Sequence, residues 1–264
     1  MNRYYDNAVA SRYDSIREWQ SPVPARLVEI ARINSSSLVL DLGCGTGNLP
    51  QAMEKICACR FIGLDLSFEM IDVANRKMAY AEFVQADCTE MPFHRECFNA
   101  VVGALFIHHV PTQLRQFLIN ESHRVLSTGY LAIVTRSHTQ IEACCYSKFF
   151  PEIIAVDKVR FPQIQEIYQW MQNTGFINIH SETVLDVPIQ IDSKFLSKVL
   201  NKSISTLDII SEASFKKGVA RLRDFIDDAK GADVVHDMAF TIVSGEKAQR
   251  VAEKEQGSTH FTDS

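Results

Sequence analysis

The sequence predicts an α/β fold in which a mostly parallel sheet carries helices on both faces. Three observations predict it. Short apolar runs typical of buried strands alternate with amphipathic segments between residues 38 and 136. A glycine-rich turn follows the first apolar run, and carboxylates follow the second and third, at Asp65 and Asp87. Such alternation builds right-handed crossover units, which bring the carboxyl ends of successive strands to one edge of a sheet.

The first strand and its turn occupy residues 38–48, Leu-Val-Leu-Asp-Leu-Gly-Cys-Gly-Thr-Gly-Asn. The apolar run is typical of a central parallel strand covered on both faces. The turn lacks β-carbons at three positions, Gly43, Gly45 and Gly47, so the chain can bend sharply there and a ligand can come close. A helix begins at the same place, and its first amides are still unpaired. Asp41 interrupts the run, so it either caps the turn or receives a cationic or hydroxylated ligand. We therefore expect ligand binding to begin at this turn.

The other elements follow from periodicity and from helix-ending signals. Further strands are expected at residues 60–65, 82–86, 98–106, 130–136, 176–180 and 240–244. Helices are expected at residues 22–31, 49–56, 70–78, 112–126, 163–173, 193–201 and 205–229. Gly175 should end the helix at 163–173.

Asp65 ends the second strand, at the edge where an adenosine ribose would present two hydroxyls to a carboxylate. Its alternative role is to cap the following helix, which Ser67 fills better. A nicotinamide oxidoreductase is the competing class, but its fingerprint is G-x-G-x-x-G. The third glycine position, counted from Gly43, is Asn48. The spacing therefore disfavours NAD.

The ordered motifs resemble those of class I S-adenosylmethionine-dependent methyltransferases of the type 11-like group. They are Asp-x-Gly-x-Gly-x-Gly at 41–47, the acids at 65 and 87, His108-His109, and Glu121-x-x-Arg124. The resemblance implies a Rossmann-like, seven-stranded, mostly parallel sheet with helices on both faces and a helical cap. It implies a seventh strand placed antiparallel between strands five and six, and S-adenosyl-L-methionine as the cofactor.

The resemblance also implies roles for individual residues. Asp87 would accept a hydrogen bond from the adenine amino group, and the Cys88 amide would serve a ring nitrogen. Met70 would flank the ring, although a methionine at helical spacing is also typical of a core. Tyr5 and Tyr13 would belong to an amino-terminal lid, or pack the first helix onto the sheet. The full set of expected cofactor contacts is Asp41, Gly43, Gly45, Gly47, Asp65, Leu66, Met70, Asp87, Cys88, Ala104, Tyr5 and Tyr13.

The acceptor side of the site is less defined. A sulfonium methyl group is already activated, so the enzyme must mainly align a nucleophile and exclude water. His109 and His108 are the candidate catalytic residues, able to orient an acceptor or take a proton late. For His109, a structural role that bonds its own loop is favoured over the role of a base. His138 and Tyr146 are further candidates. Tyr130 replaces a glycine usual in the family and should slightly reshape the acceptor floor.

A single methyltransferase domain is expected over residues 1–264. Its parts are an amino-terminal lid and helix at 1–33, a cofactor-binding core at 38–136, cap segments at 137–162 and 186–235, and a flexible tail at 247–264. The cap segments are long enough to close the ligand edge over a small-molecule methyl acceptor. Their aromatic residues should divide between a cap core and the acceptor pocket: Tyr146, Phe149, Phe150, Phe195 and Phe215.

Composition narrows the alternatives. The net charge of −5 argues against nucleic acid as a partner, although RNA methylation stays open as an alternative, as does a protein that binds the cofactor without turnover. No apolar run reaches a membrane span, and the start lacks a signal peptide, so a cytoplasmic protein is expected. The odd count of seven cysteines predicts reduced thiols. No metal site is expected, because Cys57 and Cys59 are spaced C-x-C and no second pair of ligands lies at zinc-finger spacing. The adjacent Cys144 and Cys145 could hold a soft metal or metalloid but better suit buried packing.

Overall fold

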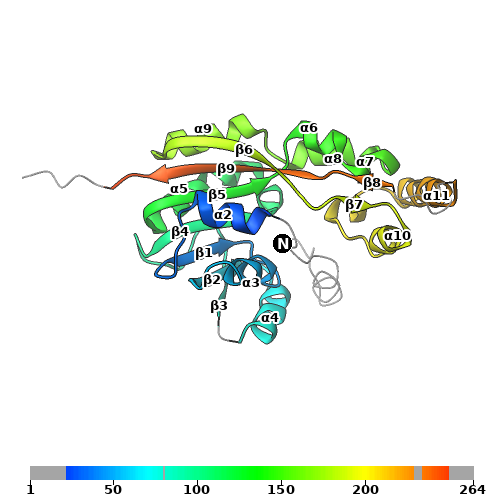
Figure 1. Ribbon diagram of the computed structural model, residues 1–264. Coiled ribbons are helices and arrows are strands. Elements are labelled where there is room, and N and C mark those ends of the chain that lie inside the picture. The colour runs from blue at the N-terminus through cyan, green and yellow to red at the C-terminus, as the bar shows by residue number, and fades with distance from the viewer. Residues whose placement is uncertain (1–21, 80, 229–233, 250–264) are drawn as a thin grey trace, which may run out of the picture.

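The computed structural model describes residues 22–79, 81–228 and 234–249. One seven-stranded sheet forms its centre, in the order β3-β2-β1-β4-β5-β9-β6 (Figure 1). The strands are β1 (Leu38–Leu42), β2 (Arg60–Asp65), β3 (Glu82–Gln85), β4 (Phe98–Ala104), β5 (Leu126–Thr135), β6 (Ile177–Leu185) and β9 (Ala239–Lys247). β9 pairs antiparallel with β5 and β6, whereas the other pairs are parallel. The predicted fold class is confirmed.

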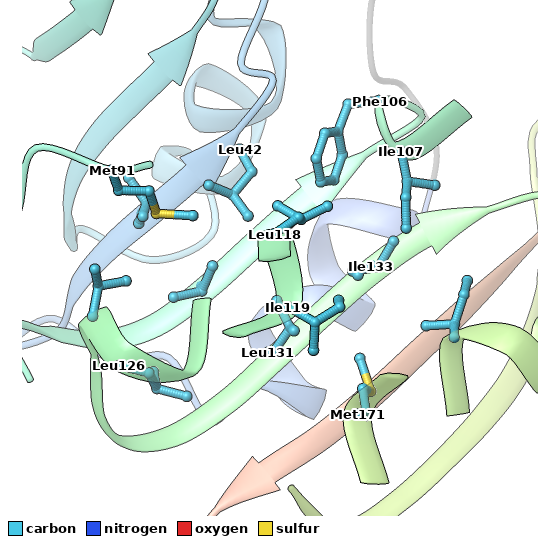
Figure 2. Close-up of a cluster of buried hydrophobic side chains, with 14 of the residues drawn as sticks. Leu42, Met91, Phe106, Ile107, Leu118, Ile119, Leu126, Leu131, Ile133 and Met171 are labelled. Atoms are coloured by element: carbon cyan, nitrogen blue, oxygen red, sulfur yellow. The ribbon is translucent and has the colours of Figure 1, made fainter. Parts of the chain in front are cut away.

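Helices cover both faces of this sheet, and each face has its own hydrophobic core. The helices are α2 (Val23–Ile30), α3 (Asn48–Glu54), α4 (Phe68–Lys77), α5 (Arg115–Val125) and α9 (Ile164–Thr174). Because strand residues alternate between faces, Leu131 joins the core with α5 and α9, while Ala132 joins the core with α2 and α3. Figure 2 shows the first core, where Leu118 and Ile119 lie near Leu131.

Strand β5 and the helix expected at 205–229 differ most clearly from the prediction. Strand β5 begins at Leu126 and passes through Gly129, whose φ is +135° and where a β-carbon would lie 2.1 Å from the Asn99 carbonyl oxygen. Tyr130 therefore lies inside β5, where it pairs with Ala100 of β4, and its hydroxyl donates to Glu246. The expected effect of Tyr130 on the acceptor floor stays a prediction. The helix expected at 205–229 is two elements, η3 (Ser205–Asp208) and α11 (Glu212–Asp228).

A second helical layer extends beyond the carboxyl ends of the parallel strands; β6 leads into it and β9 leads back from it (Figure 1). It contains α6 (His138–Ala143), α7 (Cys145–Phe149), α8 (Glu152–Arg160), α10 (Ser193–Leu200), η3, α11 and the short pair β7 (Ile189–Gln190) and β8 (Val235–His236). This layer, the cap, encloses a third core, which includes Tyr146, Phe149, Phe150 and Phe195, with Phe215 packed against it. All five aromatic residues therefore serve the cap core.

Some predicted features lie outside the described residues. These are Tyr5, Tyr13 and the rest of the lid to residue 21, and the tail from residue 250. Lys247, which was grouped with the tail, belongs to β9, and its ammonium donates to the carbonyls of His123 and Leu126 at 2.8 and 2.5 Å. All seven cysteines are free. Within the described ranges, no helix combines the length and apolar character of a membrane span.

Candidate active site

The glycine turn connects β1 to α3 and follows the backbone path that the sequence predicts. Gly43, Gly45 and Gly47 have φ values of +62°, +53° and +78°, which favour glycine. A β-carbon on Gly43 would also lie 2.4 Å from the β-carbon of Phe106, which packs over the turn. The turn therefore needs glycine for its backbone conformation and, at Gly43, for close packing as well.

Asp65, at the carboxyl end of β2, holds this turn in place. Its carboxylate accepts hydrogen bonds from the Gly45 amide and the Ser67 amide, each at 2.9 Å. Burial raises the pKa of Asp65, and these backbone bonds oppose the rise. Ser67 caps α4 by accepting from the Met70 amide, as expected. Each carboxylate oxygen has a second lone pair, so Asp65 retains acceptor capacity for a ligand.

Asp41 is a buried carboxylate inside β1, two residues before the turn. It is 1% exposed, and neither oxygen has a hydrogen-bond partner in the part of the chain that the structure describes. Burial, and then the nearby charge of Asp65, raises the pKa of Asp41 well above its ordinary value. A buried polar group without a partner is rare and destabilising. Its position suits a ligand that brings a hydrogen-bond donor or positive charge.

The other expected cofactor contacts lie along the same edge, because β3, β2, β1 and β4 are consecutive in the sheet. Asp87 is exposed just beyond β3, and one of its oxygens accepts from the amide and hydroxyl of Thr89. Burial raises the pKa of the Cys88 thiol to about 12, so that thiol is neutral. Leu66 is 65% exposed, while Met70 is buried within α4. Ala104, partly buried, ends β4.

The histidine turn η1 (Ile107–His109) follows β4 at this edge. The His108 ring stacks on Phe161 with centroids 4.0 Å apart, and the His109 ring lies 4.1 Å from that of His108. The backbone amide of His109 donates to the Phe106 carbonyl at 2.8 Å, which closes the turn. The two candidate catalytic residues therefore lie together between the sheet and α8.

A small pocket opens beside His108, where the carboxyl ends of β4 and β5 meet the cap. Its volume is about 30 Å³, and its lining residues are Leu105, His108, Arg136, Asp157, Phe161, Ile204, Ser205 and Thr206. His109 is not among them. The cap therefore meets the sheet at the edge where ligands of α/β sheets bind.

The other two candidates from the sequence take supporting positions. A ring nitrogen of His138 bonds the Phe161 carbonyl at 3.1 Å. The Tyr146 hydroxyl bonds that of Ser203 at 2.8 Å inside the cap core, and burial raises the pKa of Tyr146 to about 12.

Sequence reasoning missed the polar lining residues Arg136, Asp157, Ser205 and Thr206. One signal for Arg136 was available, because a cation directly after strand five is placed at the ligand edge. The others lie in segments with no recognisable motif, so the sequence alone did not indicate them.

Comparison with known proteins agrees with this geometry. A family model described as a methyltransferase domain matches residues 39–129, from β1 through the glycine turn, Asp65, Asp87 and the histidine turn to β5. Over that range the chain is similar to a methyltransferase domain, the class of protein whose ordered motifs it resembles.

Two relatives illustrate the range of substrates. The tRNA (carboxymethyluridine(34)-5-O)-methyltransferase of Arabidopsis thaliana is 31% identical over 136 residues, which is 51% of this chain and 32% of that protein. The demethylmenaquinone methyltransferase of Staphylococcus saprophyticus is 26% identical over 159 residues, 57% of this chain and 67% of that one. The match thus spans about a third of the first relative's length.

Solved structures share the fold at low identity. Phosphoethanolamine N-methyltransferase 2 of Haemonchus contortus, in complex with S-adenosyl-L-methionine, has a TM-score of 0.61 at 19% identity, covering 94% of this chain and 59% of that one. The [4+2]-cyclase SpnF has a TM-score of 0.54 at 16% identity, and the match covers 86% of this chain and 81% of that one. Since a cyclase shares the fold, the fold alone does not fix the reaction.

Proposed function

We propose that this methyltransferase transfers the methyl group of S-adenosyl-L-methionine to a small-molecule acceptor by in-line displacement. The observation that carries the proposal is Asp41, a buried carboxylate without a described partner beside a glycine turn held by Asp65. The cofactor offers an ammonium, two ribose hydroxyls and an adenine, and the residues along this edge are complementary to these groups.

Each part of the edge has a role in holding the cofactor. Asp41 would compensate the cofactor's ammonium, and Asp65 would accept its ribose hydroxyls through the remaining lone pairs. Asp87 and the Cys88 amide would bind the adenine, with exposed Leu66 available to cover its face. When bound, the cofactor supplies an activated methyl group on a sulfonium.

The acceptor side is supported by the position of the pocket. The pocket lies at the ends of β4 and β5, and β4 is the direct neighbour of β1, which carries the glycine turn. His108 lines it and is placed to orient an acceptor or receive a proton. The cap closes over this edge, which favours a small molecule because a folded nucleic acid would need an open surface.

RNA is the second candidate acceptor. The similarity to the Arabidopsis tRNA methyltransferase favours it, whereas the net charge of −5 and the small capped pocket count against it. The third possibility is a protein that binds the cofactor without turnover. A cytoplasmic location remains a prediction.

A transfer assay with cofactor labelled in its methyl group separates these candidates. The full chain is incubated with a low-molecular-weight cell extract or with total tRNA. The proposal predicts label in the small-molecule fraction and none in tRNA. Label in tRNA alone would establish RNA as the acceptor, and tight cofactor binding without label in either fraction would favour a binding protein.

A further inference from the structure

Arg136, immediately after β5, is a partly buried cation that lines the pocket without a carboxylate partner. One guanidinium nitrogen lies 3.5 Å from the Cys144 sulfur, and the group lies over the Phe240 ring, 5.2 Å from its centroid. Among the described residues, no carboxylate oxygen lies within ion-pair distance of it. A guanidinium taken partly out of water needs compensation, so the pocket offers a positive charge to a ligand.

The acid in the pocket wall does not cancel this charge, because it has a cation of its own. Asp157 accepts from the Thr206 hydroxyl at 2.6 Å and from the Arg160 guanidinium at 3.3 Å. Arg160 also donates to the Ser205 hydroxyl at 3.0 Å. With Cys144 as a neutral thiol, the two guanidinium groups and one carboxylate leave one positive charge, and the Ser205 hydroxyl keeps its hydrogen for a ligand.

We propose that this pocket binds a carboxylate group of the methyl acceptor, with Arg136 as its counter-ion and Ser205 as a second donor. The proposal rests on the proposed function, since it names the chemical class of that acceptor as a small organic acid. A guanidinium presents a planar fork that matches a carboxylate in a bidentate pair. The cavity of about 30 Å³ has room for roughly two water molecules, which suits a carboxylate better than a larger phosphate.

Cys144 is the competing counter-ion. Its pKa is lowered to about 5, chiefly by a hydrogen bond from Cys145 and also by the charge of Arg136. A thiolate here would satisfy one N–H of the guanidinium and leave the others for the pocket. The two interpretations differ in the wild type: a carboxylate site at Arg136 binds a carboxylate with Cys144 in place, whereas a thiolate counter-ion would allow that binding only in Cys144→Ala.

The test measures acetate binding to the full chain in the presence of S-adenosylhomocysteine, with neutral acetamide and inorganic phosphate as comparison probes. Acetate should bind more tightly than acetamide or phosphate. Arg136→Gln should weaken acetate binding about tenfold, the loss expected for one charge-assisted hydrogen-bonded pair. Arg223→Gln, at an exposed position on α11, is the matched control and should bind acetate as the wild type does.

Calorimetric binding of S-adenosylhomocysteine to each variant separates the two proposals. Unchanged acetate binding in an Arg136→Gln protein that still binds the cofactor product would overturn the carboxylate site alone. Absence of cofactor binding by the wild type would overturn the proposed function. If phosphate binds more tightly than acetate, the carboxylate proposal is overturned, and the pocket binds the phosphate of a phosphate ester instead. If Arg136→Gln does not fold, Arg136→Lys replaces it in the test. Lysine keeps the positive charge but lacks the planar guanidinium that pairs with both carboxylate oxygens, so this variant should bind acetate more weakly than the wild type.

Discussion

Asp41 is a single buried residue that lowers the stability of the fold. A carboxylate in a central strand, 1% exposed and without a described partner, destabilises the fold whether it is ionised or neutral. Its raised pKa means that the folded chain favours the protonated form. As far as Asp41 is concerned, the free energy of unfolding is therefore highest below the pKa of unfolded aspartate. It falls as the pH rises from there to the raised pKa of Asp41 in the folded chain.

The substitution Asp41→Asn tests this interpretation. Without cofactor, the variant should be more stable than the wild type near neutral pH by roughly 1–3 kcal/mol, and the difference should shrink towards about pH 4. Urea unfolding at several pH values measures it. The same variant should bind S-adenosyl-L-methionine more weakly. A variant that is less stable than the wild type at every pH would show that Asp41 supports the fold.

Asp65 makes a different prediction because its oxygens already have partners. Asp65→Ala removes the acceptor for the Gly45 amide and for the expected ribose hydroxyls, so cofactor affinity should fall by about 1–3 kcal/mol. Circular dichroism should show a folded chain, since Ser67 still caps α4. Asp72→Ala, at a surface acid paired with Arg76 on α4, is the matched control and should leave the affinity unchanged. If Asp65→Ala binds the cofactor as tightly as the wild type does, Asp65 has only a structural role.

At the scale of elements, the cap depends on one close helix contact. Gly218 lies in α11, and a β-carbon there would lie 2.1 Å from the ring of Phe150. Gly218→Ala should therefore destabilise the protein by about 1–3 kcal/mol through overpacking, although alanine is the better helix former. Lys217→Ala, at the exposed neighbouring position, should be nearly neutral in the same urea titration. A more stable Gly218→Ala protein would mean that α11 can move away from Phe150 freely.

The strands and the cofactor edge could be predicted because their signals are local. The apolar run at 38–42, the glycines and Asp65 each follow one another within a single crossover unit, so spacing alone places them. The start of β5 could not be predicted, because Gly129 resembles a turn residue and its strand conformation depends on contact with Asn99. The acceptor pocket could not be predicted either, since Arg136, Asp157 and Ser205 come from three segments joined only by cap packing.

At the scale of the whole molecule, the sheet and the cap have separate hydrophobic cores and meet at the acceptor pocket. Arg115, buried at the start of α5, joins them by donating to the Val110 carbonyl at 3.0 Å and the Arg160 carbonyl at 2.5 Å. The edge that carries the glycine turn and Asp65 belongs to the sheet alone, whereas the small pocket is lined by residues of both layers. If the proposed function holds, the cap could change its acceptor without altering the proposed cofactor edge.

The proposed binding site for S-adenosyl-L-methionine is the edge formed by the glycine turn, Asp41 and Asp65. Calorimetric titration of the full chain with S-adenosyl-L-methionine, S-adenosylhomocysteine and NAD measures whether the chain binds this cofactor. We predict micromolar binding of the first two ligands and no heat from NAD, because the turn lacks the third glycine of a dinucleotide site at Asn48. Tight binding of NAD with no response to S-adenosyl-L-methionine would contradict this proposal.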